Sequence, residues 1–133
     1  MSDEHKFECL LVWTGAAKGP TSTYEAYSRE YRIDIQGKPS IRGSAAPNFR
    51  GDGSLHNPED LLVAALSACH CLSYLALCAR GGVQVVSYED AVDGKMDRVE
   101  GVVRFTEVTL HPKVAIAPGS DAEKARALHE RAR

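Results

Sequence analysis

The stretch that most constrains the fold is residues 57–82, in which no charged side chain occurs between positions 61 and 79. It opens with Asn57, which can cap a helix, followed by a proline and two acidic residues that suit the first helical turn. It closes with Arg80 and two glycines, a pattern typical of a helix C-terminus. These signals predict one helix of about six turns.

The apolar residues of this helix are spread around its whole circumference, which is typical of a helix that is buried on every side. Polar residues within it and an acidic start make it a poor membrane span. We therefore expect a soluble protein without a membrane partner, built around an enclosed helix.

The remaining sequence predicts a single domain over residues 1–133. A net charge of -2 provides no basic surface for phosphates, so we expect no nucleic-acid partner. Residues 1–6 lack the apolar core of a signal peptide, so we predict a cytoplasmic protein with reduced thiols.

Strand-like patterns flank the central helix on both sides. They cover residues 7–13, 24–35, 40–44, 83–91 and 101–113, with a turn at Asp93-Gly94 and a second, amphipathic helix over 121–133. The apolar parity changes between Phe105 and Val108, which predicts a β-bulge there. The order predicts an α+β fold in which antiparallel sheet wraps the long buried helix.

One modest sheet can cover only one side of that helix. A second copy of the chain, related by a two-fold axis, is the simplest cover for the other side. We therefore expect a homodimer.

The centre of the helix reads Cys69-His70-Cys71, where the two thiols point roughly 200° apart and cannot share a metal ion. We therefore expect no metal site. Cys9, Cys71 and Cys78 are best interpreted as small buried apolar residues. For Cys69, spacing alone leaves open an inert core thiol or a reactive one.

Residues 57–61 (Asn-Pro-Glu-Asp-Leu) and 64–69 (Ala-Ala-Leu-Ser-Ala-Cys) together resemble the helix signature of the OsmC/Ohr family, the osmotically inducible and organic hydroperoxide resistance proteins. The resemblance continues through residues 49–52, 87–90 and 105–110. It implies an intertwined homodimer and a thiol-dependent peroxidase that reduces organic hydroperoxides during oxidative stress.

The resemblance places the family's reactive cysteine at Cys69 and its acidic partner at Glu59. The family's activating arginine matches Arg29 best, with Arg50 as the second candidate. A guanidinium can stabilise the thiolate, which is the nucleophile. Glu59 can hold that guanidinium in place through a bidentate ion pair.

Glu59 and Cys69 lie about 15 Å apart along one continuous helix. We therefore expect Glu59 and the arginine to reach Cys69 from the partner subunit. Cys69 then becomes a sulfenic acid, and a second thiol condenses with it to a disulfide. In the family an external dithiol, often a lipoylated protein, restores the enzyme, and no cofactor is expected.

His70 points about 100° away from Cys69, so a hydrogen-bonded interior histidine is favoured over a catalytic base. Two other functions stay open. One is a non-catalytic dimeric binding or redox-sensing protein, and the other is a thiol hydrolase or transferase in which Cys69 works with a distant histidine.

In the family the resolving cysteine follows the C-terminal helix and leads into a last strand. The sequence ends with residues 128–133, which belong to the predicted helix, so we expect it to lack that cysteine-containing segment and strand. We expect either that the sequence is a truncated form of a longer chain, which is the favoured explanation because a strand is missing as well, or that resolution uses an external thiol or one of Cys9, Cys71 and Cys78.

Overall fold

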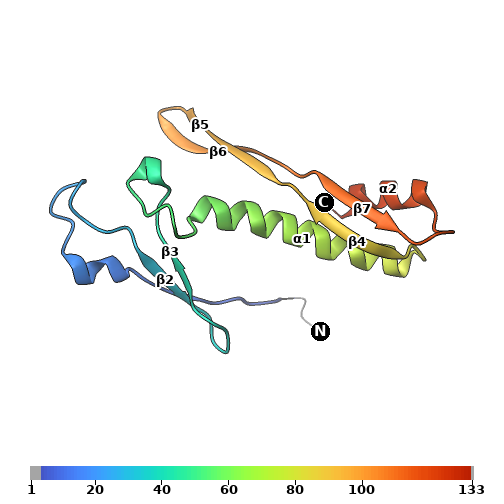
Figure 1. Ribbon diagram of the computed structural model, residues 1–133, viewed down its shortest axis with the longest axis horizontal. Helices are drawn as coiled ribbons and strands as arrows, with labels where there is room; N and C mark the ends of the chain where they lie inside the picture. The colour runs from blue at the N-terminus through green and yellow to red at the C-terminus, as the bar shows by residue number, and fades with distance from the viewer. Residues whose placement is uncertain (1–3, 133) are drawn as a thin grey trace. The chain divides into compact units, whose positions relative to one another are not determined.

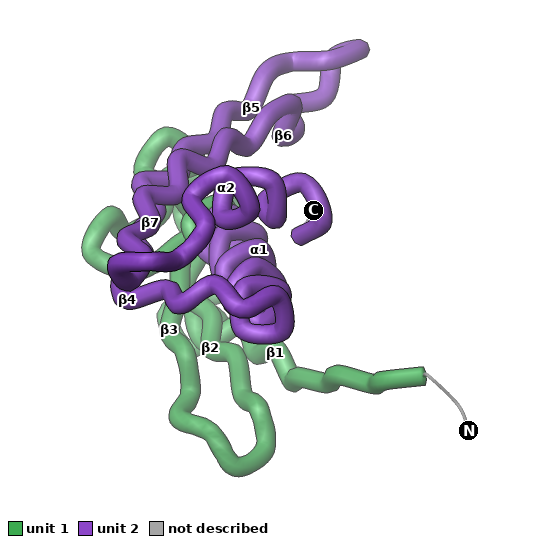
Figure 2. Tube along the Cα trace, turned by 90° about the vertical axis from the view of Figure 1, so that its right-hand side faces the viewer, with its two compact units in different colours: residues 1–61 green, residues 62–133 purple. Residues whose placement is uncertain are grey.

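The computed structural model describes residues 4–132, and within them the fold is α+β (Figure 1). The chain divides into two compact units, Met1–Leu61 and Leu62–Arg133 (Figure 2). The predicted α+β class with antiparallel sheet is therefore confirmed, and each unit is described in turn.

Unit 1 carries a three-stranded antiparallel sheet in the order β1-β2-β3. Its strands are β1 (Leu10–Val12), β2 (Tyr31–Asp34) and β3 (Ile41–Gly43), with the 3-10 helices η1 (Thr14–Lys18) and η2 (Pro47–Phe49) between and after them. All three lie within the predicted strand regions but are shorter. Cys9 precedes β1 and is exposed, so its interpretation as a buried residue was wrong.

Helix α1 (Pro58–Arg80) begins and ends where the sequence signals predict. The Asn57 side chain accepts a hydrogen bond from the Asp60 backbone N–H at 2.8 Å, and the Asp60 carboxylate accepts one from the Asn57 N–H at 3.2 Å. At the other end Gly82 adopts a left-handed φ of 78°, and the Val83 N–H donates to the Cys78 carbonyl. Local capping therefore sets both ends of the helix.

Unit 2 contains two antiparallel strand pairs and the second helix. Strand β4 (Val85–Asp90) pairs with β7 (Pro112–Ile116), and β5 (Asp93–Val99) pairs with β6 (Val102–Thr109). Helix α2 (Ala122–Arg131) is capped by the Asp121 side chain, which accepts from the Lys124 N–H. The predicted C-terminal helix is confirmed.

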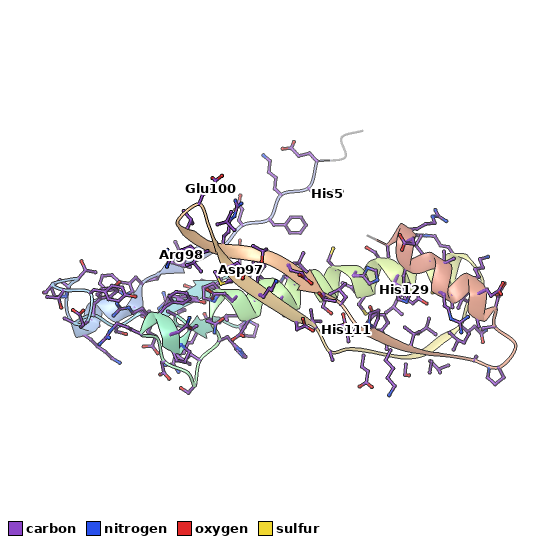
Figure 3. The ribbon with its side chains drawn as sticks, turned by 90° about the horizontal axis from the view of Figure 1, so that it is seen from above. His5, Asp97, Arg98, Glu100, His111 and His129 are labelled. Carbon is purple, nitrogen blue, oxygen red and sulfur yellow. The ribbon has the colours of Figure 1, made fainter. Side chains whose placement is uncertain are left out.

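Two predictions for this region were wrong. Asp93-Gly94 is the start of β5 instead of a turn, and the single strand expected over residues 101–113 is divided between β6 and β7. The predicted bulge is confirmed: Lys95 pairs with Glu107 and Met96 with Phe105, which leaves Thr106 as the extra residue. Figure 3 shows Arg98 and Glu100 near the turn of this exposed hairpin.

The core of unit 2 forms where α1, α2 and the β4–β7 pair meet. Its buried members are Tyr74, Cys78, Val83, Ala125, Leu128 and Ala132. Within α1, only Tyr74 and Cys78 are buried among the described residues, whereas Leu62, Leu66 and Leu72 are 42%, 44% and 69% exposed. The expectation of a fully enclosed helix is therefore not met within a single chain, because the core of unit 2 buries α1 only at Tyr74 and Cys78.

Gly51 allows the loop after η2 to pass very close to the backbone of Ala45. A Cβ atom at this position would lie 1.6 Å from the Ala45 carbonyl oxygen. We expect Gly51→Ala to lower the free energy of unfolding by about 1–3 kcal/mol, because backbone atoms must move to accept the methyl group. Chemical denaturation at fixed protein concentration measures this.

Gly53→Ala is the matched control, since its Cβ would meet only the Pro47 side chain at 3.2 Å. Equal losses of stability in the two variants would contradict the explanation.

Candidate functional site

Cys69 lies in the middle of α1 and is exposed in the single chain. Leu62, Leu66 and Leu72, which the sequence places on the same side of the helix, are exposed as well. Cys71 is half-buried and Cys78 is buried, as expected of small apolar residues. Among the described cysteines of α1, Cys69 is thus the most open to a reagent.

Glu59 occupies the second position of α1, and its carboxylate is partly withdrawn from solvent. Its Oε2 atom is buried and accepts no hydrogen bond from any residue between 4 and 132. The same holds for the hydroxyl of Tyr31 in β2. Burial raises the pKa of Tyr31, and the carboxylates of Glu59 and Asp60 raise it further. The Tyr31 hydroxyl therefore stays neutral and can donate a hydrogen bond near Glu59.

Arg29 lies just before β2, and aromatic rings hold its guanidinium. The Cζ atom is 3.6 Å from the centroid of the Tyr27 ring and 4.7 Å from that of Tyr24. The guanidinium also donates to the Tyr27 carbonyl at 2.5 Å and to the Tyr24 carbonyl. Cation–π stacking and these hydrogen bonds fix its position without using a carboxylate.

Arg50 caps η2 in a left-handed conformation, with φ of 65°. It lines a cavity of about 250 Å³ in unit 1, and Arg29 lines the same cavity. The structure thus brings the two candidate arginines to one place. Arg29, Arg50 and Glu59 belong to unit 1, and Cys69 and His70 belong to unit 2.

His70 is hydrogen-bonded within unit 2, in agreement with its interpretation as an interior histidine. Its Nε2 lies 3.0 Å from Nδ1 of His129 on α2, and the two rings stack with centroids 5.2 Å apart (Figure 3 labels His129). The Tyr74 ring stacks on His129 at 3.8 Å, and its hydroxyl donates to the Ala125 carbonyl at 2.6 Å. This cluster joins α1 to α2.

The histidine pair makes the stability of the fold depend on pH. Burial lowers the pKa of His129, and the neighbouring His70 lowers it further. The unfolded chain therefore binds a proton more readily than the folded one. The contribution of His129 to the free energy of unfolding is complete above about pH 6.5, the pKa of an unperturbed histidine. It falls as the pH decreases from there through the lowered pKa of His129 in the folded state, by at most about 1.4 kcal/mol per pH unit.

Denaturation between pH 5 and 8 tests this, where wild type should lose stability on acidification and His129→Gln should show a flatter profile. His5→Gln removes an exposed histidine and should keep the wild-type profile (Figure 3). Identical profiles for wild type and His129→Gln would contradict the explanation.

Sequence reasoning missed three residues around these positions: Lys18, which lines the cavity with the arginines, Tyr31 near Glu59, and His129. Each of the three is far in sequence from the residue that it approaches, so only the tertiary fold brings the two together. The one available signal was the position of Tyr31 in an alternating strand pattern that leads toward Ile33 and Ile35.

Comparisons with known proteins show which family the chain is similar to. A family model for OsmC-like proteins matches residues 51–133, which is more than half of the sequence and includes Glu59 and Cys69. Peroxiredoxin OsmC of Escherichia coli (strain K12) is 32% identical over 66 residues, which are 50% of this chain and 46% of that protein. The match therefore spans about half the length of this curated relative.

Solved structures agree over nearly the whole chain. An OsmC-like protein of unknown function from Vibrio cholerae aligns with a TM-score of 0.86 and 26% identity, covering 97% of this chain and 88% of its own. An organic hydroperoxide resistance protein from Elizabethkingia anophelis, solved with thiocyanate bound, aligns with a TM-score of 0.72 at 20% identity, covering 99% and 84%. The second likeness supports the fold alone.

By length and composition α1 could cross a membrane, with a mean hydropathy of 2.0 over its most apolar 18-residue window. Core helices of soluble proteins share this property. Because the OsmC-like structures align over 97% or more of the chain, we interpret α1 as the core helix of a soluble fold. The family match, the resemblance of residues 57–69 and the agreement in fold lead to one conclusion: the chain belongs to the family of OsmC-like proteins.

Proposed function

We propose that the protein is a thiol-dependent peroxidase that reduces organic hydroperoxides to alcohols through Cys69. Its family membership suggests hydroperoxide resistance of the peroxiredoxin type. The observation that carries the proposal is the position of Cys69, exposed on α1 within the segment that matches the family. A cysteine peroxidase needs a thiol that a peroxide can reach.

The proposed reaction begins when the Cys69 thiolate attacks the peroxide oxygen distal to the organic group. A sulfur–oxygen bond forms as the oxygen–oxygen bond breaks, and the departing alkoxide takes a proton to become an alcohol. Cys69 is left as a sulfenic acid. A thiol of an external dithiol condenses with it, releasing water and forming a mixed disulfide. The second thiol of the dithiol then displaces Cys69 and leaves oxidised.

We propose that each site combines Cys69 of one subunit with Arg29 and Glu59 of the other. Because α1 is continuous from Pro58 to Arg80, Glu59 and Cys69 of one chain lie about 15 Å apart. The buried Glu59 Oε2, which lacks a donor among the described residues, is suited to a guanidinium. The exposed leucines beside Cys69 are suited to cover by a second copy.

A role for His70 as the base that activates Cys69 is less well supported. The Nε2 of His70 is engaged with His129, and its ring lies in a stack with Tyr74 and His129. A base that activates a cysteine must reach the sulfur directly. The contacts of His70 therefore favour a structural role at the joint between α1 and α2.

The test measures turnover of cumene hydroperoxide with several dithiols, beside hydrogen peroxide and a thioester. We expect rapid reduction of the organic hydroperoxide, slower reduction of hydrogen peroxide, and no thioester cleavage. Loss of one thiol per chain within the first turnover should accompany the reaction. Thiol loss at the slow rate of a free cysteine would instead support a non-catalytic binding protein, and thioester cleavage would support the hydrolase.

A further inference from the structure

The cavity of about 250 Å³ in unit 1 carries more positive charge than a structural pocket needs. Its cationic lining residues are Lys18 from η1, Arg29 before β2, and Arg50 after η2. Pockets for drug-sized ligands start at about 300 Å³, so this one suits a smaller molecule. Since it lies wholly within unit 1, its shape needs no other part of the chain.

The acidic residues of the cavity already have partners. The Glu30 carboxylate accepts from the Arg42 guanidinium. The Asp52 Oδ1 accepts from the backbone N–H of Ser54 at 2.9 Å and from its hydroxyl at 2.7 Å, and these hydrogen bonds hold the pKa of Asp52 below its usual range. The Glu30 charge is therefore balanced by Arg42, and the Asp52 carboxylate, which the charges of Arg42 and Lys18 also favour in its ionised form, balances at most one of the three cations.

The cations keep unused donors. Within residues 4–132 neither Lys18 nor Arg50 forms an ion pair, and Arg29 donates only to backbone carbonyls. A guanidinium carries five N–H donors, so Arg29 retains several for a ligand. Charged donors around a small cavity favour a compact anion.

The wall that carries Arg50 is built by the backbone. Arg50 has a left-handed φ of 65°, a conformation that costs energy for a residue with a side chain and is common at functional sites. Next to it, Gly51 packs against Ala45 too closely for any Cβ, and the Asp52 N–H donates to the buried Ser44 hydroxyl at 3.0 Å. The backbone of this loop therefore fixes the position of the Arg50 Cα atom, from which the side chain extends.

We infer that this cavity binds one small anion, a carboxylate or a phosphate, between Lys18, Arg29 and Arg50. The anion would be held by charge-assisted hydrogen bonds, with its polar oxygens directed at the three cations. The inference concerns binding in unit 1 and does not require the proposed peroxidase activity. It does share Arg29 with that proposal, so a bound anion would compete for the same guanidinium.

Isothermal titration of inorganic phosphate and, separately, of acetate tests the inference. The full chain with Cys69→Ser is used, so that thiol chemistry cannot contribute heat, and chloride keeps the ionic strength constant. We expect saturable binding of one anion per chain, and the tighter of the two probes identifies the headgroup. Lys18→Gln and Arg50→Gln should each weaken binding about tenfold, the loss of one charge-assisted hydrogen bond.

Lys38→Gln is the matched control, because Lys38 is exposed and does not line the cavity. It should bind like the parent protein, and Arg50→Lys should retain most of the affinity if the Arg50 charge matters. Absence of saturable binding for both probes would overturn the inference. Equal weakening by Lys38→Gln would overturn it too, because the anions would then respond only to net charge. Lys18→Gln, an exposed change, keeps the test valid if Arg50→Gln does not fold.

Discussion

Cys69→Ser should reduce the rate of hydroperoxide reduction at least about a thousandfold, because a serine hydroxyl is neither ionised nor oxidisable under these conditions. Cys69 is the exposed thiol of α1 and the only cysteine that the family resemblance assigns to the attack. The measurement is single-turnover consumption of cumene hydroperoxide, followed with trapping of sulfenic acid by dimedone.

Cys71→Ser is the matched control for that variant. It changes a half-buried thiol two residues further along the same helix, on a different side. Its first turnover should proceed at nearly the wild-type rate, whatever role Cys71 has in resolution. First-turnover rates that fall equally in the two variants would show that substitution disturbs α1 instead of removing the nucleophile.

Arg29→Gln should slow the same reaction by about a hundredfold or more, because a neutral amide cannot hold the attacking sulfur as a thiolate or stabilise charge on the peroxide. The change keeps an unbranched polar side chain beside Tyr24 and Tyr27 and removes the charged guanidinium that lies over their rings. Trapping of the Cys69 sulfenic acid by dimedone provides a second readout, and it should slow to the same extent.

Arg50→Gln separates the two arginine candidates that line one cavity. We expect it to leave both the rate of reduction and the rate of sulfenic acid trapping close to wild type. The opposite result, with a large effect for Arg50→Gln and a small one for Arg29→Gln, would transfer the activating role to Arg50.

The ends of the two helices could be predicted because their signals are local. Asn57 and Asp60 exchange hydrogen bonds within one turn, and Gly82 adopts its left-handed φ at the point where the helix stops. Asp121 caps α2 in the same way. A few neighbouring residues settle these geometries, so the sequence alone is sufficient.

Strand β5 could not be predicted because nothing in its own composition favours a strand. It is mostly exposed, and it includes charged residues such as Lys95 and Asp97. Its conformation comes from pairing with β6 across a two-residue turn, Glu100-Gly101, in which both residues have positive φ. A ladder between strands is a tertiary property that alternation of apolar residues does not report.

Individual site residues could be proposed from the sequence, but the residues that lie next to them in the fold could not. The resemblance to the OsmC/Ohr family selected Cys69 and Glu59, and it matched the family's arginine to Arg29 or Arg50. The sharing of one cavity by both arginines became visible only in the fold. The cover of α1 is a further example: its periodicity predicts full burial, whereas one chain leaves Leu72 69% exposed.

The most direct test of the account mixes two inactive proteins, Cys69→Ser and Arg29→Gln, after unfolding and refolding them together. If each site combines Cys69 of one subunit with Arg29 of its partner, mixed dimers contain one intact site. The mixture should then recover about a quarter of wild-type turnover, since about half of randomly assembled dimers are mixed and each carries one of two sites. A mixture as inactive as its two components would contradict a site shared between subunits.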